Sequence, residues 1–155
     1  MFNRILVPID GSNTSLAALD QAIAMAKAFQ STVTVVYVID PYPFTGVGPE
    51  FTYGQDQYQN AARAEGHAAL EVATTRLKAA GVTPDTHVVE AHAIWRGIIE
   101  TVTNTKADLV VMGSHGRRGL ERLVLGSVTQ SVLAHSTVDT LVVHPAPQAA
   151  KPAKG

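Results

Sequence analysis

A glycine-rich segment in the last third of the chain has the spacing best suited to chemistry. Gly113 is followed after two residues by Gly116, and after nine more residues by the pair Gly126 and Ser127. Glycines let backbone N–H groups approach an anion closely, because no Cβ stands in the way. A helix opening at Gly126 would add free N–H groups and a positive end, and the hydroxyls of Ser127 and Thr129 can donate to phosphate oxygens. The segment predicts a phosphate site, although an ordinary turn would also use such glycines.

Two earlier residues suit the remainder of a nucleotide. Asp10 ends an apolar run, and its carboxylate can accept hydrogen bonds from both hydroxyls of a ribose. Val38 lies near the end of the next apolar run, where its backbone can pair with an adenine edge beside its apolar side chain. Asp10 has a second interpretation as a helix cap, because aspartate is preferred at that position. The expected ligand is therefore ATP or a close adenine nucleotide.

Four basic side chains lie within the glycine-rich segment. His115 stands between the first two glycines and can touch phosphate. Arg117, Arg118 and Arg122 either clamp phosphates bidentately or form a solvated face of the loop, and the sequence leaves both readings open. We expect the other histidines to be surface or structural residues.

Several better-known sites are absent from the sequence. No lysine follows Gly126, so the segment is not a P-loop, and the chain contains neither G-x-G-x-x-G nor the G-x-S-x-G elbow of a serine hydrolase. A phospho-receiver domain would need an acceptor aspartate after the third strand and a lysine after the fifth, where this chain has Glu90 and His144. The chain has no cysteine, which excludes disulfides and thiolate metal sites.

The pattern of apolar residues predicts alternating strands and helices. Strands are expected at 4–10, 32–39, 83–90, 109–112 and 140–144, the third being polar enough for a sheet edge. Helices are expected from about 13 to 30 and at 56–80, 94–105 and 126–135, whereas the Pro- and Gly-rich stretch 40–55 is expected to be irregular. Strict alternation predicts one doubly wound parallel sheet covered by helices on both faces. Ligands of such sheets bind beyond the carboxyl ends of the strands, where the residues singled out above fall.

Composition bounds the remaining possibilities. The 155 residues fit a single domain over 1–145, followed by a flexible tail over 146–155. A formal net charge of -1 argues against a uniformly basic nucleic-acid binder. The opening residues do not form a signal peptide and no apolar stretch approaches the length of a membrane span, so we expect a cytoplasmic protein.

Three segments carry a resemblance to the universal stress protein family over Met1 to His144. They are RILVPIDGS at 4–12, DLVVMGSHGRRGLERLVLGSVTQSVL at 108–133 and LVVHP at 141–145. The resemblance implies a five-stranded parallel sheet in the order 3-2-1-4-5 with four helices on two faces. The spacing G-x2-G-x9-G-S resembles that of the family's ATP-binding branch. Two departures are Ala91-His92, where the family often has glycine, and Asp139, where it often has proline.

By position, the resemblance assigns roles to particular residues. Asp10 would hold the ribose and Val38 the adenine. Ribose and phosphate contacts would come from Gly113, Gly116, Gly126 and Ser127, and the pocket would be lined by Pro8, Met112, Val128 and Thr129. The ligand would be ATP, ADP or AMP, with Mg²⁺ bound through the phosphates.

The last strand and the glycine motif together suggest what the protein does. An apolar strand at a sheet edge needs to be covered, and pairing of Thr140, Leu141, Val142 and Val143 with a second copy would form a homodimer, as the resemblance also implies. We expect a stress-response module in which nucleotide binding is coupled to dimer or partner state. One alternative is a slow ATPase or phosphotransferase, disfavoured because no obvious base lies near the phosphates. Another is a nucleotide-free dimeric scaffold, against which the intact glycine motif argues.

Overall fold

Five parallel strands and four helices alternate along the chain in this computed structural model, which describes residues 1–41, 49–115 and 125–145 (for 49–53, the backbone alone). The elements are β1 (Arg4–Pro8), α1 (Asn13–Phe29), β2 (Thr32–Ile39), α2 (Pro49–Ala79), β3 (Thr86–Glu90), α3 (Ile94–Thr105), β4 (Leu109–Gly113), α4 (Ser127–His135) and β5 (Asp139–Val143). The strands are ordered β3-β2-β1-β4-β5, and all four neighbouring pairs are parallel. This confirms the predicted fold, including the edge position of the polar third strand.

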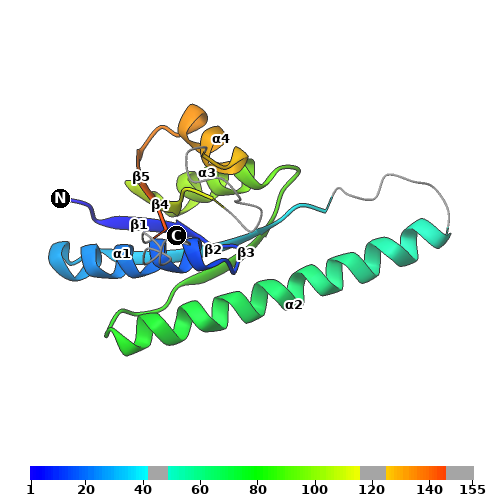
Figure 1. The fold of residues 1–155 in the computed structure, drawn as a ribbon, viewed down its shortest axis with the longest axis horizontal. Helices are drawn as coiled ribbons and strands as arrows, with labels where there is room; N and C mark the ends of the chain where they lie inside the picture. The colour runs from blue at the N-terminus through cyan, green and yellow to red at the C-terminus, as the bar shows by residue number, and fades with distance from the viewer. Residues whose placement is uncertain (42–48, 116–124, 146–155) are drawn as a thin grey trace, which may run out of the picture.

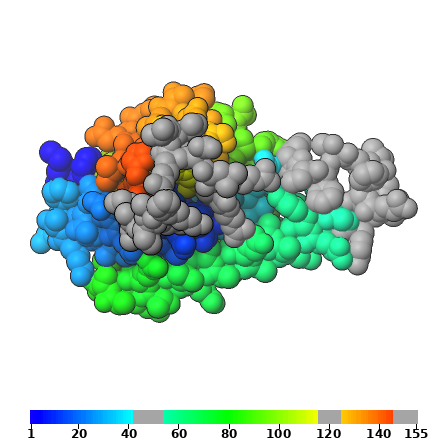
Figure 2. Space-filling view, in the orientation of Figure 1, coloured from blue at the N-terminus to red at the C-terminus, as the bar shows by residue number. Residues whose placement is uncertain are grey.

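The helices cover the sheet in two layers. Side chains of α1 and α2 pack against one face in a core that includes Ile5, Leu19 and Leu77. On the other face α3 and α4 cover a second core that includes Leu6 and Ile98. Figure 1 shows α1 and α2 below the sheet and α3 and α4 above it, and the space-filling view keeps α1 and α2 on one side of the molecule (Figure 2). The central strands are buried on both faces, which explains their continuous apolar sequences.

The second helix begins earlier than predicted. Residues 49–55 were expected to be irregular, but α2 begins at Pro49 and runs for 31 residues, about 46 Å at 1.5 Å per residue. Proline suits the first helical turn because the N–H that it lacks would have no partner there. Gly54 within the helix costs only about 1 kcal/mol relative to alanine, so it does not end the helix. The first half of α2 extends beyond the carboxyl ends of the strands (Figure 1).

The first helix is capped by Ser12. The Oγ of Ser12 accepts a hydrogen bond from Ser15 N at 3.2 Å, and Ser12 has extended backbone angles, as an N-cap should. Gly11 just before it has φ of 84°, a left-handed conformation that glycine adopts without strain. Together they fix the sharp turn from the end of β1 into α1.

Candidate functional site

The order of the strands fixes where a ligand crevice should lie. From β1 the chain crosses through α1 to β2 on one side, whereas β4 and β5 lie on the other side of β1. The strand order therefore reverses between β1 and β4, and doubly wound sheets bind ligands beyond the carboxyl ends at this point. The strand ends that meet here are Pro8 to Asp10 and Met112 to His115. The fold therefore brings Asp10 close to the start of the glycine-rich segment, as expected for a nucleotide site.

Asp10 braces the turn that leaves β1. Its Oδ1 accepts a hydrogen bond from Ser12 N at 2.9 Å, and its own N–H points to Ser15 Oγ at a longer 3.4 Å. The side chain that caps α1 is that of Ser12 rather than Asp10, although Asp10 has a structural role of its own in holding the turn. The half-buried Asp10 is thus held at the carboxyl end of β1, beside the reversal point.

Val38, the residue expected to contact adenine, lies near the end of β2 and faces the same carboxyl end of the sheet through its backbone. The carbonyl of Val36 accepts from Ile9 N at 2.9 Å, so the backbone groups of Val36 point toward β1. Because backbone direction alternates along a strand, those of Val38 point the same way, beyond the last residue of β1. The side chain of Val38 packs toward α3, where a Cβ on Gly97 would lie 2.5 Å from Val38 Cγ1. Val38 is therefore fixed by close packing while its backbone groups point to the space beyond the carboxyl end of β1.

Gly113 and Thr129 have roles in the fold itself. A Cβ on Gly113 would stand 2.8 Å from Thr14 Cγ2 and 3.2 Å from the Thr14 backbone, so only glycine lets α1 pack this closely on β4. The hydroxyl of Thr129, which is 3% exposed, donates to the carbonyl of Gly113 at 2.8 Å. Thr129 therefore ties α4 to the end of β4, and its hydroxyl proton is used within the protein.

The start of α4 is pinned against the end of β4. Gly126 is the N-cap residue, and its N–H donates to the Ser114 carbonyl at 2.8 Å. Its angles, φ −61° and ψ 153°, are open to any residue, and no side chain caps the helix. The next N–H groups, beginning with Ser127, belong to the first helical turn and have no partner within the helix. The positive end of α4 thus lies at the carboxyl end of β4.

His115 is joined to its neighbour and has one buried nitrogen to spare. The Oγ of Ser114, a residue that is fully buried, lies 2.9 Å from His115 Nδ1. The other ring nitrogen, Nε2, is buried and has no hydrogen-bond partner in the part of the chain that the structure describes. The sequence singled out His115 but missed Ser114; a serine directly before the histidine of a glycine loop is the signal that would have found it.

The remaining predicted residues divide into two groups. Pro8 and Met112 are buried at the ends of β1 and β4, and Val128 packs on the α3 side of the sheet. Gly116, Arg117, Arg118 and Arg122 lie outside the described residues, as does the tail 146–155.

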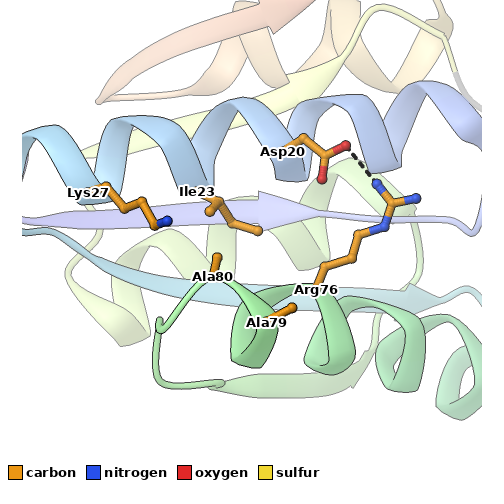
Figure 3. Close-up of a pocket in the computed structure, with 6 residues that line it drawn as sticks. All are labelled: Asp20, Ile23, Lys27, Arg76, Ala79 and Ala80. Atoms are coloured by element: carbon orange, nitrogen blue, oxygen red, sulfur yellow. Dashed lines mark hydrogen bonds and ion pairs between the residues drawn. The ribbon is translucent and has the colours of Figure 1, made fainter.

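Two surface hollows lie elsewhere on the described surface. One, of about 450 Å³, lies between α1 and α2 and is lined by Asp20, Ile23, Lys27, Arg76, Ala79 and Ala80 (Figure 3). Within it the Arg76 guanidinium pairs with Asp20 Oδ2 at 2.7 Å. The other, of about 270 Å³, is lined by Gly11, Leu16, Glu65, Ala68, Ala69 and Val72. Neither includes a residue of the glycine-rich segment.

Neither a cluster of metal-ligating side chains nor a membrane-spanning helix is found among the described residues. Within residues 1–41, 49–115 and 125–145, no three His, Cys, Asp or Glu side chains gather closely enough to hold a metal ion. Of the helices in that part of the chain, none combines the length and apolar character needed to span a bilayer.

Comparison with known proteins identifies the family. The model of the universal stress protein family matches residues 1–144. The chain belongs to this family. Universal stress protein MJ0531 of Methanocaldococcus jannaschii is 36% identical over 143 residues, which cover 92% of this chain and 82% of that protein.

Solved structures of other proteins share the fold. Hypothetical protein MJ0577, the subject of a structure-based assignment of biochemical function, is 26% identical with a TM-score of 0.81, over 95% of this chain and 99% of that one. A universal stress protein in complex with cAMP is 28% identical with a TM-score of 0.67, over 94% of this chain and 98% of that one. The resemblance read from the sequence is thus confirmed at the level of family and fold.

Proposed function

We propose that this universal stress protein binds ATP, or a close adenine nucleotide, at the carboxyl ends of β1, β2 and β4. The observation that carries the proposal is that Asp10 and the pinned start of α4 lie at the carboxyl ends of the neighbouring strands β1 and β4, between which the strand order reverses. A nucleotide needs a partner for its ribose and a partner for its phosphates. A carboxylate can accept hydrogen bonds from the ribose hydroxyls, and the positive end of a helix attracts the phosphates. The spacing of Gly113, Gly116, Gly126 and Ser127 supports the same ligand.

The relative bound to cAMP supports the adenine and ribose half of the ligand, because it shares more than a quarter of its sequence with this chain. In our proposal Val38 offers its backbone to adenine and Asp10 holds the ribose. Phosphates lie against Gly116, Gly126, Ser127 and His115, within walls formed by Pro8, Met112, Gly113, Val128 and Thr129. Mg²⁺ accompanies ATP by bridging its phosphates rather than by occupying a cage of side chains.

Nucleotide binding would act as a regulatory signal in the cytoplasm through a homodimer. β5 lies at the edge of the sheet, and the Val143 carbonyl accepts from Ser114 N at 2.9 Å, so Val143 faces β4. By alternation the N–H and carbonyl of Val142 point to the open edge, where a second copy of β5 can pair. Val142→Pro removes an outward donor and leaves the β4 ladder intact. We expect it to shift the protein toward monomer in light scattering; an unchanged dimer would place the interface elsewhere.

The first experiment identifies the nucleotide directly. The purified protein is denatured and any released nucleotide is identified by mass, and ATP is then titrated into the stripped protein by calorimetry. We expect Gly126→Val to weaken ATP binding by about tenfold or more, equivalent to about 1.4 kcal/mol, because the added side chain obstructs the approach to α4. Ala134→Val, on the exposed far end of α4, is the matched control and should bind as the wild type does.

The outcomes separate the candidate functions. Binding that is lost in Gly126→Val while the far-ultraviolet circular dichroism is unchanged supports the nucleotide module. A turnover assay on the same protein then tests the slow ATPase or phosphotransferase. A folded dimer that binds no adenine nucleotide would overturn the proposal and favour a protein-interaction scaffold.

A further inference from the structure

The pair formed by Ser114 and His115 fixes where the proton of the histidine ring lies. Ser114 is fully buried at the end of β4, and its Oγ is 2.9 Å from His115 Nδ1. Two arrangements would satisfy this distance. Either the serine hydroxyl donates to an unprotonated Nδ1, or a protonated Nδ1 donates to the serine oxygen.

The buried hydroxyl decides between them. A serine hydroxyl carries one proton, and within the described residues His115 Nδ1 is its partner. If Nδ1 carried a proton, the Ser114 hydroxyl proton would be buried without an acceptor, which is costly. The hydroxyl therefore donates to Nδ1, and the neutral ring must carry its proton on Nε2.

The proton on Nε2 makes this nitrogen a hydrogen-bond donor that has no acceptor among the described residues. His115 Nε2 is buried and lacks a partner among the described residues. Buried polar groups nearly always have a partner, so a donor left over in this way calls for an external acceptor. The carbonyl of Ser114 also accepts from Gly126 N at 2.8 Å, so the residue directly before His115 is bonded to the positive end of α4. An oxygen with negative charge would satisfy both features.

We propose that Ser114 is a positioning residue that holds His115 in the Nε2–H tautomer, and that Nε2–H donates to a phosphate oxygen of the bound nucleotide. This inference rests on the proposed function and adds selectivity to it. Nucleotides gain the hydrogen bond from His115, whereas adenosine, which has no phosphate, does not. Ser114 contacts no ligand in this scheme; it acts through the ring.

The tautomer is measured first, on the stripped full-length protein. Nitrogen-15 NMR of the histidine rings in mildly alkaline buffer distinguishes Nε2–H from Nδ1–H, and His115→Gln assigns the signal. We expect the Nε2–H form in the wild type and a mixture of tautomers in Ser114→Ala. An Nδ1–H ring in the wild type would overturn the inference whether or not nucleotide binds.

Binding of ATP and adenosine then tests the donor. Glutamine places an amide nitrogen near the position of Nε2, whereas asparagine places it near Nδ1. We expect His115→Asn and Ser114→Ala to weaken ATP binding by about tenfold and about threefold, since a charge-assisted hydrogen bond is lost or left unoriented. His115→Gln should retain most of the affinity, and adenosine should bind all variants equally. His67→Gln, an exposed histidine on α2, is the control.

The results distinguish this inference from the proposed function. ATP affinity that is equal in His115→Asn and the wild type would overturn the phosphate contact while leaving the nucleotide module in place. If the wild type binds neither ATP nor adenosine, the proposed function and the phosphate contact both fail, and the NMR result still decides the role of Ser114.

Discussion

At the amino end of the sheet a carboxylate joins neighbouring elements, whereas at the carboxyl end a histidine nitrogen is buried without a partner among the described residues. The Asp108 carboxylate, just before β4, accepts from Asn3 N at 2.8 Å and from Arg4 N at 3.0 Å. Arg4 in turn donates to the Thr105 carbonyl at 3.2 Å. These contacts join the start of β1 to the start of β4 and to the end of α3.

The carboxyl end uses similar residue types differently. Asp10 braces a turn, yet His115 Nε2 is buried without a described partner, and α4 begins with a glycine rather than a capping side chain. Folding alone accounts for the aspartate at the amino end and not for the histidine at the carboxyl end. Polar groups that folding leaves without a partner therefore indicate where a ligand binds, and amino-acid composition does not give this information. Substitutions at the amino end should cost stability, and those at the carboxyl end should cost ligand.

The largest expected effect is a loss of stability at a residue of the carboxyl end, where substitutions should otherwise affect ligand binding. Gly113 lies at the carboxyl end, but a Cβ there would meet Thr14 Cγ2 at 2.8 Å and the Thr14 backbone at 3.2 Å. We expect Gly113→Val to lower the free energy of unfolding by about 1–3 kcal/mol through overpacking, whether or not nucleotide is present. Urea unfolding measures it, with Gly126→Val as the matched glycine where the backbone angles tolerate a side chain. Equal stability of Gly113→Val and the wild type would contradict the packing role.

A pair of aspartate variants sharpens the comparison between the ends. Asparagine at position 10 keeps an oxygen for Ser12 N but loses the charge and half of the acceptors. We expect Asp10→Asn to weaken ATP binding by about tenfold, or about 1.4 kcal/mol, with little change in stability. Asp108→Asn should do the reverse and leave calorimetric ATP affinity unchanged. A loss of affinity in both variants would show that the two ends are coupled.

Asp108 should also make stability depend on pH. Partial burial raises the pKa of this carboxyl, but hydrogen bonds from the backbone N–H groups of Asn3 and Arg4 outweigh it, so the pKa lies below its ordinary value of 3.8. A lowered folded-state pKa stabilises the protein above the ordinary pKa, and the contribution is lost as pH falls through the folded value. At neutral pH, we expect Asp108→Asn to cost about 0.5–1 kcal/mol, a small value because solvent screens the site.

The measurement is urea unfolding of both proteins from neutral to acidic pH. The two curves should converge as pH falls below 3.8, because a protonated Asp108 resembles asparagine. A difference that persists unchanged into acid would mean that the charge of Asp108 is not the cause.

The smallest effect should come from the groove between α1 and α2. The Arg76–Asp20 pair spans 2.7 Å, but both side chains are more than a third exposed. Exposed ion pairs contribute about 0–1 kcal/mol, so Arg76→Ala should change stability by about 0.5 kcal/mol or less. ATP affinity should be unchanged, since this groove is separate from the carboxyl end. A clear loss of affinity would move the ligand to the surface in Figure 3.

Local patterns were enough to predict most of the fold. β2 spans Thr32–Ile39 and α3 spans Ile94–Thr105, as their β-branched run and apolar stripe indicated. The start of α2 was wrong because Pro49 and Gly54 were read as breakers, whereas their cost depends on their position in the helix. Several strand limits also differ from the prediction. β3 was expected to begin at Thr83 but begins at Thr86, beyond Pro84.

The site was harder to predict, because its geometry depends on contacts between distant segments. The sequence marks Gly113 as a glycine of a phosphate loop, but the packing of Thr14 against it depends on how α1 crosses the sheet. Thr129 was predicted to donate to phosphate, yet its proton goes to the Gly113 carbonyl. The role of Ser114 requires knowing that it is buried and which ring nitrogen it faces. The roles in ligand binding remain predictions.

The 2.8 Å contact between Gly126 N and the Ser114 carbonyl has a further consequence. It joins Ser114 to Gly126, so the two ends of the stretch between them are held together at the carboxyl end of β4. Because these ends are already held together, a longer stretch should cost little stability, since doubling a loop costs only about 0.6 kcal/mol in closure entropy. We therefore expect that segments of other lengths and compositions can be inserted between Ser114 and Gly126 without unfolding the sheet, which would allow ligand specificity to be engineered there.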